Sequence, residues 1–459
     1  MKNRRISPYL LVMFSFLGGI LVGGFLLSTP FAQQSGTWGN YASNVFMATS
    51  AVCVTGFDCF PEGLANTYTL FGQIVELILM QIGGLGMITV LVFFITLFHK
   101  NISFKDRHYI SQATGSTTIP HVVNFVRKIL LITLIFETLG FCLGIPAFID
   151  LYGNTPQAYF TALFHAVSAF NNAGLDVFGG NTSLMRIPGS AMSRMSDWAY
   201  YYLTSYTMIL IILGGLSYIA LIEIFSFKKK PHQWTAHTKI CLLMTAGLVI
   251  GGTLLIFLTN GIYNSTGYPI SFYDSLFLSV TSRTAGYSTY DPTHLNIVGR
   301  VINWVLMFIG GGPLGTASGI KTTTIFIIFL AMFSFFRGRK VKAFNRYYTQ
   351  SLIVKAMSVM LMAVFMIILG FIAVTLFERN NPMFNSEAAL YETVSAYTNT
   401  GLSMGMPVFL SVGGKITYVV LMYFGRLGPM TLISIFSNNM YIDVDDKHVK
   451  YVEEDIVIG

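Results

Sequence analysis

The chain has 459 residues, of which 53% are hydrophobic and only 10% are charged, and its mean hydropathy is +0.62. Soluble globular domains carry roughly 25% charged residues, so this composition excludes a soluble protein and indicates an integral membrane protein. The net charge of +8 does not require a nucleic-acid partner, because the anionic membrane lipid of an inner leaflet accounts for it.

Several apolar runs are each long enough to cross a bilayer, which requires about 20 residues. The first run follows Lys2, Arg4 and Arg5, as a signal peptide does. It exceeds the apolar length of about 7 to 15 residues that is typical of a signal peptide, so we expect a retained helix. The sequence thus predicts an all-α integral membrane protein with eight crossings, at residues 8–29, 70–98, 129–148, 200–227, 239–259, 299–336, 353–377 and 415–436.

Lysine and arginine residues indicate which side of the membrane each boundary faces. The chain has 28 of them, and most lie at every second boundary between apolar runs. By the positive-inside rule these boundaries are cytoplasmic, so both termini are expected inside. The clusters lie in residues 2–5, 100–128, 228–239, 337–355 and 447–450.

Four short segments lie between an outward and an inward run, at residues 43–53, 158–170, 271–282 and 386–397. Each is about a dozen residues long, which is too short to span a bilayer and suits a re-entrant helix. Each segment leads into a small turn with a single glycine. Glycine permits backbone carbonyls to turn toward a pore axis, and rings of carbonyls can replace the hydration shell of a cation. The predicted filter turns are Val54, Thr55 and Gly56; Asn172, Ala173 and Gly174; Thr284, Ala285 and Gly286; and Asn399, Thr400 and Gly401.

The succession of outward helix, short helix, glycine turn and inward helix occurs four times. Each unit starts and ends on the cytoplasmic side, so the units are parallel and predict a central pore with pseudo-fourfold symmetry. The carboxyl ends of the short helices would face the centre, where their dipoles favour a cation. The predicted units are residues 1–99, 100–230, 231–340 and 341–438, followed by an acidic cytoplasmic tail at 439–459.

The third inward run, 299–336, is nearly twice as long as a helix that spans a bilayer, so it must break. A glycine motif recurs in every inward run, at Gly83-Gly84, Gly214-Gly215, Gly311-Gly312 and Gly425-Arg426-Leu427-Gly428, and the glycine-rich third copy is expected to break its helix. Irregular backbone at membrane depth has to line a cavity or be buried in protein, so this loop could gate a pore or serve only as a hinge. The loop residues are Gly310, Gly311, Gly312, Pro313, Gly315, Thr316, Ser318 and Gly319.

Two polar residues near the turns are expected to have structural roles. Arg283 lies three residues before a filter glycine, where a charge on the axis would repel the permeant ion. We therefore expect it to brace the filter from behind, with Asp274 or Glu392 as a neutralising partner. His165, on the second short segment, is expected to be packed or hydrogen-bonded. Three short segments also carry a serine six residues before the glycine, whereas the third has Val280 there and Ser279 beside it; the serines are Ser50, Ser168 and Ser395.

The four single-glycine turns, the helix–re-entrant–helix repeats and the glycine-rich break in the third unit resemble the Trk/Ktr/HKT superfamily of potassium uptake proteins, specifically its bacterial Ktr-type membrane subunit. The resemblance covers nearly the whole chain. It implies K⁺ held at the filter by backbone carbonyls, sodium-dependent uptake and a place in the bacterial plasma membrane. It also implies a homodimer with one pore per protomer and a cytoplasmic ring of RCK/KTN-type regulatory subunits, which alone would bind nucleotide.

The resemblance also bears on two further cations at membrane depth. In the family, the position of residues 310–319 is an intramembrane gate loop, and Lys321 follows it directly. Lys321 would anchor the loop or repel cations in the closed state. Arg426 corresponds to an arginine of the last inward helix that faces the pore. The alternative role for Arg426 is a salt bridge, with possible partners Glu76, Glu137 and Glu392.

Two other classes of membrane protein fit the sequence less well. A secondary symporter for another cation or small solute would more often show inverted repeats and intramembrane acids for coupling. A membrane enzyme would need a nucleophile or metal set, and the chain has no His-Glu-x-x-His motif or comparable set. The sequence therefore predicts potassium uptake through a carbonyl filter, and no enzymatic activity.

Overall fold

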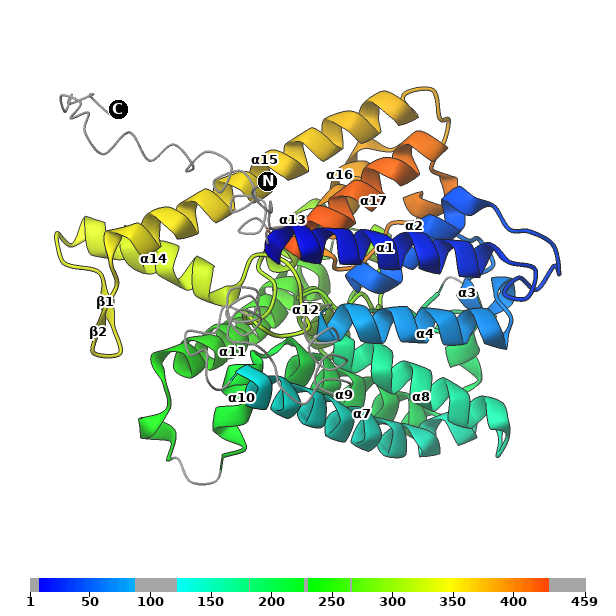
Figure 1. The fold of residues 1–459 in the computed structure, drawn as a ribbon, viewed down its shortest axis with the longest axis horizontal. Coiled ribbons are helices and arrows are strands. Elements are labelled where there is room, and N and C mark those ends of the chain that lie inside the picture. Colours follow the sequence, from blue (N-terminus) through cyan, green and yellow to red (C-terminus); the bar gives the residue numbers. More distant parts are fainter. Residues whose placement is uncertain (1–7, 87–121, 181, 227–229, 265, 429–459) are drawn as a thin grey trace, which may run out of the picture.

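The computed structural model describes residues 8–86, 122–180, 182–226, 230–264 and 266–428. This part of the chain is helical except for one short hairpin of β1 (Lys342–Ala343) and β2 (Arg346–Tyr347), as Figure 1 shows. The predicted tail at 439–459 and most of the basic stretch at 100–128 lie outside the described residues.

The first two predicted units contain the expected outward, short and inward helices. In the first unit, α1 and α4 both pack on the short helix α2. Side-chain oxygens cap two of its helices, because Asn40 accepts from the amide of Ser43 and Thr69 accepts from that of Gly72. The helices are α1 (Pro8–Ser28), α2 (Tyr41–Cys53), α3 (Leu64–Thr67), α4 (Leu70–Leu85), α7 (Val122–Tyr152), α8 (Pro156–Asn171), η2 (Ala191–Arg194), α9 (Asp197–Gly215) and α10 (Tyr218–Ile224).

The last two predicted units repeat this order. Helices α14 and α15 project together from the body as an arm that carries the hairpin at its end (Figure 1). The helices are η3 (Pro231–Gln233), α11 (Ala236–Ile256), η4 (Phe257–Ile262), α12 (Phe272–Thr281), η5 (Pro292–His294), α13 (Ile297–Phe308), α14 (Thr322–Phe336), α15 (Gln350–Glu378), α16 (Ser386–Thr398), η6 (Met406–Phe409) and α17 (Val412–Leu427).

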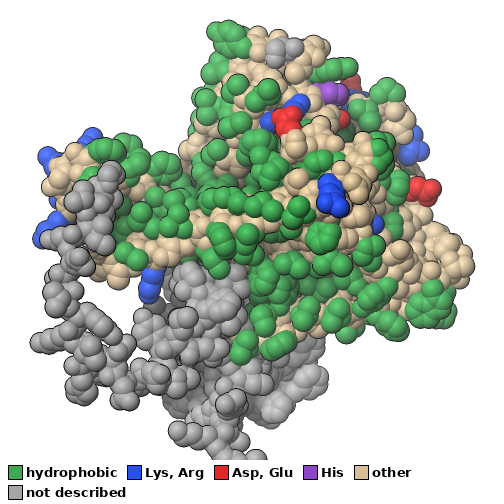
Figure 2. Space-filling model, turned by 90° about the horizontal axis from the view of Figure 1, so that it is seen from above, with side chains coloured by type: hydrophobic (Ala, Val, Ile, Leu, Met, Phe, Trp, Pro, Cys, Tyr) green, Lys and Arg blue, Asp and Glu red, His purple; other side chains and the backbone are tan. Residues whose placement is uncertain are grey.

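Each predicted apolar run contains a helix or a broken helix pair. By length and composition, three helices of the described residues can cross a membrane: Asn124–Tyr152, Ala236–Ile262 and Gln350–Glu378. The pair α9 and α10 adds a fourth span if its bend of 106° is counted within one crossing. Hydrophobic side chains cover most of the face in Figure 2, while Lys and Arg gather at the end of the projecting arm. This surface suits contact with lipid.

A break in the inward run is not confined to the third unit, where α13 and α14 are separated by the loop at 310–319. Helix α9 also breaks at its glycine pair, α4 ends at Leu85, and α17 ends at Leu427. Gly86 and Gly428 follow with φ of 79° and 78°, a left-handed conformation that ends a helix. Residues beyond these glycines in the first and fourth units lie outside the described part. Among the described residues, the second and third inward runs are interrupted, and the first and fourth inward helices end at the equivalent place.

Close packing explains why glycine occupies these positions of the inward helices. A Cβ atom added to Gly83, Gly214 or Gly425 would lie within 3.0 Å of a carbonyl oxygen near the end of a short helix. Those oxygens belong to Val52, Phe170 and Tyr397, respectively. Only glycine lets the inward helix approach the short helix this closely. These glycines thus seat the first, second and fourth inward helices directly behind a filter turn.

Candidate functional site

Each filter turn has the same unusual backbone. The residue two places before the glycine has a positive φ in all four turns: 58° at Val54, 59° at Asn172, 71° at Thr284 and 52° at Asn399. Such values are uncommon for non-glycine residues and are true outliers for β-branched ones. The glycines follow with φ of 97°, 67°, 83° and 85° at Gly56, Gly174, Gly286 and Gly401. A repeated conformation of this kind is typical of a functional site that its surroundings hold in place.

The turns meet one another in a closed order. A Cβ atom added to any of the four filter glycines would lie within 3.0 Å of a carbonyl oxygen in the next turn. The order runs from Gly56 to Ala173 O, from Gly174 to Ala285 O, from Gly286 to Thr400 O, and from Gly401 back to Thr55 O. The structure therefore brings all the predicted filter residues together, with the carbonyl that precedes each glycine at the point of contact.

Hydrogen bonds fix neighbouring turns to each other and to their short helices. Thr55 Oγ1 donates to Asn399 Oδ1 at 2.8 Å, which links the first turn to the fourth. Ser50 Oγ accepts from the amide of Gly56 at 3.1 Å, and Ser168 Oγ donates to Leu175 O at 2.7 Å. Ser395 Oγ, by contrast, has no partner among the described residues. The predicted serine position therefore braces the first two turns only.

The third turn is braced by a residue that the sequence pattern missed. Thr281 Oγ1 donates to Tyr287 O at 2.6 Å, as Ser168 does in the second turn, whereas Ser279 donates to Val249 O of α11 at 3.0 Å. Thr281 lies five residues before its glycine because α12 ends differently, without the left-handed cap of α8. The sequence offered one signal for this role, a hydroxyl residue one position closer to the glycine than the serines of the other units.

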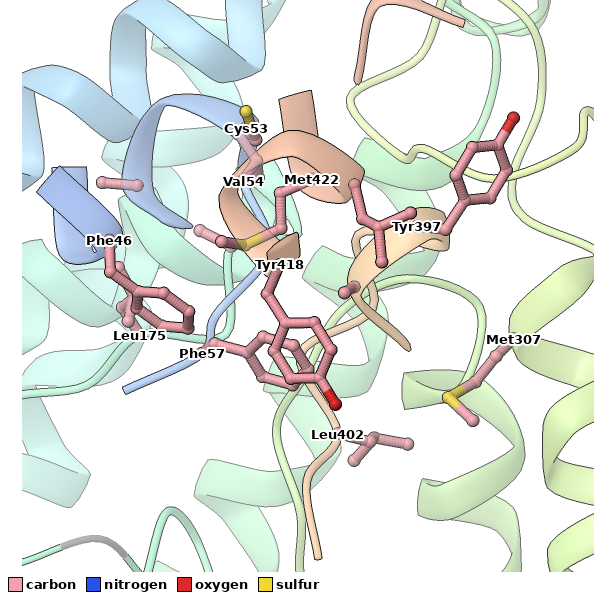
Figure 3. Close-up of a cluster of buried hydrophobic side chains, with 14 of the residues drawn as sticks. Phe46, Cys53, Val54, Phe57, Leu175, Met307, Tyr397, Leu402, Tyr418 and Met422 are labelled. Carbon is pink, nitrogen blue, oxygen red and sulfur yellow. The ribbon is translucent and has the colours of Figure 1, made fainter. Parts of the chain in front are cut away.

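Apolar side chains anchor the backbone just beyond the glycines. The residue after each glycine is buried in all four turns: Phe57, Leu175, Tyr287 and Leu402. In Figure 3, Phe57 faces Tyr418 of α17, and their ring centroids are 6.1 Å apart. Since buried side chains in a packed core have little freedom to move, the filter turns are held rigidly.

A cavity of about 210 Å³, which we call the filter cavity, opens beside the turns and is lined by all four filter glycines. The residues two places after the glycines also line it, namely Asp58, Asp176, Ser288 and Ser403. Both aspartates accept a backbone amide, Asp58 from Phe60 at 2.8 Å and Asp176 from Phe178 at 3.2 Å. Sequence reasoning missed these acids, although Gly-Phe-Asp and Gly-Leu-Asp repeat in the first two turns.

Burial controls the charge of these two acids. Loss of solvent raises the pKa of Asp58 to about 6 and the pKa of Asp176 to about 7. The backbone amides oppose the shift, and for Asp176 the nearby Asp58 adds to it. Both carboxyl groups therefore change charge near neutral pH, at the side of the filter that faces the cavity.

The loop at 310–319 lies against the turns and the broken end of α9. Ser318 donates its amide to Thr284 Oγ1 at 3.1 Å, and Thr316 Oγ1 donates to Phe170 O at 3.1 Å. The amides of Gly312 and Thr316 donate to the glycine-pair carbonyls of α9 at 2.9 and 3.1 Å. The predicted loop residues are thus held at the filter by four separate hydrogen bonds.

Arg426 joins this loop to the opposite side of the filter. Its guanidinium donates to Thr316 O at 2.6 Å and to Ser318 Oγ at 2.9 Å, and also to the carbonyl of Gly83 at the end of α4. Lys321 Nζ donates to Ala317 O at 2.6 Å. Both cations therefore bind carbonyl oxygens of the loop region.

The alternative of a salt bridge for Arg426 does not form among the described residues. Glu137 accepts from Gln81 and Asn171, and Glu392 accepts from groups that follow the fourth turn. Both carboxyl oxygens of Glu76 are buried without a hydrogen-bond partner in the described part of the chain. Backbone carbonyl dipoles and the Ser318 hydroxyl therefore stabilise the charge of Arg426 in place of a carboxylate.

Arg283 and His165 are both buried next to the filter turns, and neither lines the filter cavity. Arg283 Nη1 donates to Thr245 O of α11 at 3.4 Å, and neither expected acid is its hydrogen-bond partner among the described residues. His165 Nε2 is 2.8 Å from Thr207 Oγ1, and its ring lies among four aromatic rings. Both side chains pack the filter and lie outside the ring of turns.

Comparison with known proteins agrees with this geometry. The family model TrkH, described as a cation transport protein, matches residues 27–444. The chain is 32% identical to the potassium/sodium uptake protein NtpJ of Enterococcus hirae, over 100% of this chain and 98% of that protein. It is 30% identical to the Ktr system potassium uptake protein B of Bacillus subtilis, over 99% of this chain and 97% of that protein.

A solved structure supports the same fold. The potassium transporter TrkH from Vibrio parahaemolyticus matches with a TM-score of 0.71 at 17% identity, over 96% of this chain and 87% of that one. The apolar helices and this match indicate a multi-pass membrane protein. The chain belongs to the TrkH family of cation transport proteins, which are transporters and not enzymes.

Proposed function

We propose that this chain is the ion-translocating subunit of a Ktr-type potassium uptake system, with the four glycine turns as its selectivity filter. The single observation that carries the proposal is the closed order in which each filter glycine faces a carbonyl oxygen of the next turn. A ring of this kind can replace the hydration shell of a cation without any fixed charge. The names of the similar uptake proteins favour potassium as that cation.

The four predicted units, 1–99, 100–230, 231–340 and 341–438, would form parallel repeats around the pore. The shared positive φ two residues before each glycine supports this symmetry, as does the closed order of the turns. The short helices α2, α8, α12 and α16 end at the turns, so their negative dipole ends favour a cation there. With one glycine per turn, fewer carbonyl rings are available than in a Thr-Val-Gly-Tyr-Gly filter, and a looser preference for potassium over sodium follows.

The filter cavity would be the extracellular mouth of the pore. The predicted topology leads the chain outward after each glycine, and the cavity lies among the residues that follow the glycines. Its carboxylates, Asp58 and Asp176, would raise the local concentration of cations before they enter the ring. The charge at this mouth would then depend on external pH.

The loop at 310–319 would gate the pore from the cytoplasmic side. Its hydrogen bonds reach the third filter turn, the end of the short helix α8, the end of α9 and, through Arg426, the end of α4. In this closed arrangement, Lys321 and Arg426 place positive charge beside the cation path. Opening requires the loop to exchange these bonds for others, so binding energy from a partner can control it.

The assembly would be a homodimer in the bacterial plasma membrane, with both termini in the cytoplasm and a cytoplasmic ring of RCK/KTN-type subunits. Nucleotide would bind only to the ring, and Na⁺ would activate uptake. Two similar proteins of Bacillus subtilis are named as proteins B and D of a Ktr system, which favours partner subunits. The exposed basic end of the arm between α14 and α15 suits an inward-facing contact.

Uptake of Rb⁺ by cells that lack their own potassium uptake systems tests this proposal. Cells that express the chain with a Ktr-type regulatory partner should accumulate Rb⁺. Na⁺ should accelerate this uptake, and K⁺ should inhibit it. Equal membrane levels of the Arg426→Gln variant allow gating to be assessed in the same assay. Absence of Rb⁺ uptake, with sodium-coupled uptake of an organic solute instead, would replace the proposal with the symporter alternative.

A further inference from the structure

One position on the short helices differs sharply between the four units. Nine residues before the filter glycine the chain has Met47, His165, Phe277 and Glu392. All four side chains are buried, and Glu392 is 0% exposed. A fully buried carboxylate is costly unless its surroundings stabilise it, so its contacts indicate its role.

Glu392 binds the segment that leaves the fourth turn. Its Oε1 atom accepts from Ser403 Oγ at 2.7 Å, from the amide of Met404 at 3.0 Å and from the amide of Met406 at 2.9 Å. Hydrogen bonds to an ionised group are stronger than those between neutral groups. The other oxygen, Oε2, is buried without a hydrogen-bond partner among the described residues. A single oxygen therefore holds one hydroxyl and two backbone amides of the segment beyond Gly401.

Ser403 connects this carboxylate to the filter cavity. It lies two residues after its glycine, the place that Asp58 and Asp176 occupy in the first two units and Ser288 in the third. Ser288 Oγ donates to a backbone carbonyl, that of Tyr290. Ser403 Oγ instead donates to a carboxylate. The fourth wall of the cavity thus has an acidic group one hydroxyl behind its surface.

The second unit holds the equivalent segment in another way. His165 packs against Phe178, four residues after Gly174, with ring centroids 5.7 Å apart. That contact fixes the backbone by packing and leaves the carboxylate of Asp176 to face the cavity. The fourth unit lacks an acid in the lining and has it on the short helix. In the second unit the carboxylate lies in the cavity lining. In the fourth unit the carboxylate lies behind the lining, on the short helix.

We propose that Glu392 is a positioning residue for cation selection, which sets the fourth wall of the filter cavity through Ser403 and the amides of Met404 and Met406. This inference rests on the proposed function of the cavity as the cation entrance. Replacement of the carboxylate by an amide removes the charge and weakens the three hydrogen bonds that Oε1 accepts, so the fourth wall relaxes and its negative charge is lost. Cation affinity and selectivity then fall, whereas the rate of transport at saturation does not.

Rb⁺ uptake against Rb⁺ concentration, with and without competing Na⁺, tests this role in cells with equal membrane levels of each variant. Glu392→Gln should raise KM about tenfold, which corresponds to roughly one charge-assisted hydrogen bond, and should leave Vmax within about twofold. Inhibition by Na⁺ should increase in parallel. Ser403→Ala keeps the two backbone bonds to Glu392, so it should fold normally and raise KM about threefold.

Glu378→Gln is the matched control. Glu378 is also a buried carboxylate, and it accepts from the hydroxyl and amide of a serine, Ser411, at 2.6 and 2.9 Å. It holds Ser411, the N-cap residue of α17, and does not line the filter cavity, so its variant should keep the wild-type KM and sodium inhibition. An equal rise of KM in Glu378→Gln would overturn the inference, because any weakened outer contact would then suffice.

The outcomes separate this inference from the proposed function. Wild-type uptake together with unchanged KM and sodium inhibition in both Glu392→Gln and Ser403→Ala would overturn the inference alone. A wild-type protein that takes up no Rb⁺, even with its regulatory partner, would overturn the proposed function and this inference with it.

Discussion

In the proposed mechanism, charge at single residues controls how cations reach the filter. Asp58 and Asp176 lie two residues after their filter glycines and line the filter cavity together with Asp291, and both are half-buried. Burial disfavours the charged form of a carboxyl group, so each acid gives up its charge at a higher pH than in water. Neither group needs to bind the ion directly, because a carboxylate beside a narrow path already attracts cations.

Uptake should therefore depend on external pH. The pKa of Asp58 is about 6 and that of Asp176 about 7, so both are ionised above pH 8 and neutral below pH 5. As pH falls through this window, the KM for Rb⁺ should rise several-fold, because the cavity loses negative charge. The double variant Asp58→Asn with Asp176→Asn should show the high KM at every pH. A wild-type KM that stays constant from about pH 8 to pH 5 would contradict this role.

The same shifts have a consequence for stability. Burial raises both pKa values above the ordinary value of 3.8, so the folded state holds these protons more tightly than the unfolded chain, and its stability falls as pH rises from about 4 to about 7. Each Asp→Asn variant should thus gain thermal stability relative to wild type above about pH 7 and show little difference below about pH 4. Thermal unfolding of purified protein in detergent measures this directly. Equal differences at both pH values would argue against a protonation effect.

At this scale the sequence predicted the glycines but not their neighbours. A single glycine in a polar run predicts a turn, since only glycine takes positive φ at no steric cost. Nothing in the sequence predicts a left-handed Val54 or Thr284, because β-branched residues avoid that region unless the fold imposes it. The role of Thr281 was missed for a similar reason: its place depends on how α12 ends.

Glycines near the ends of the inward helices allow these helices to pack closely behind the filter. The short helices were predictable from their length and position, and their observed bounds agree closely with the predicted ones. The ends of the inward helices were not predictable, because α4 and α17 stop where a carbonyl of a short helix leaves room for no side chain. Such close approaches depend on tertiary packing and leave only an ambiguous glycine pair in the sequence.

Adding a methyl group at these pairs should destabilise the fold. Gly83→Ala, Gly214→Ala and Gly425→Ala each place a Cβ against a short-helix carbonyl, and overpacking of this kind costs about 1–3 kcal/mol. Gly247→Ala in α11 is the control, since its Cβ would meet nothing within 4 Å and alanine favours a helix. Unfolding temperatures in detergent should fall for the first three and hold or rise for the control. A similar change in all four would refute close packing as the cause.

The loop at 310–319 gives an element-scale prediction about gating. Deletion of residues 311–317 removes Thr316 and its bond from Arg426, so the loop no longer closes the path and the Vmax for Rb⁺ should rise several-fold. Deletion of residues 341–347 removes an equally long stretch, the hairpin at the end of the arm, and does not touch the filter. A folded 311–317 deletion with unchanged Vmax would leave the loop as a hinge.

The whole molecule encloses its candidate site between four parts of one chain. Composition predicted the membrane, and the recurring short helices and glycine turns predicted that segments far apart in the sequence meet. The acidic lining of the filter cavity could not be predicted, because Asp58, Asp176 and the Glu392–Ser403 pair become neighbours only after the four turns assemble. The four units contribute different residues to the cavity lining, so the sequence of any one unit does not reveal the cavity.

Substitution of the four filter glycines tests the central claim most directly. Gly56→Ser, Gly174→Ser, Gly286→Ser and Gly401→Ser each place a side chain at positive φ and against the next turn's carbonyl. At equal membrane levels, each should lower Rb⁺ uptake or its preference over Na⁺ by about tenfold or more, because the strain and the displaced carbonyl act at one ring. Gly18→Ser in α1, where a Cβ meets nothing within 4 Å, should behave as wild type. Normal uptake and selectivity in all four filter variants would contradict the account and leave the turns as packing.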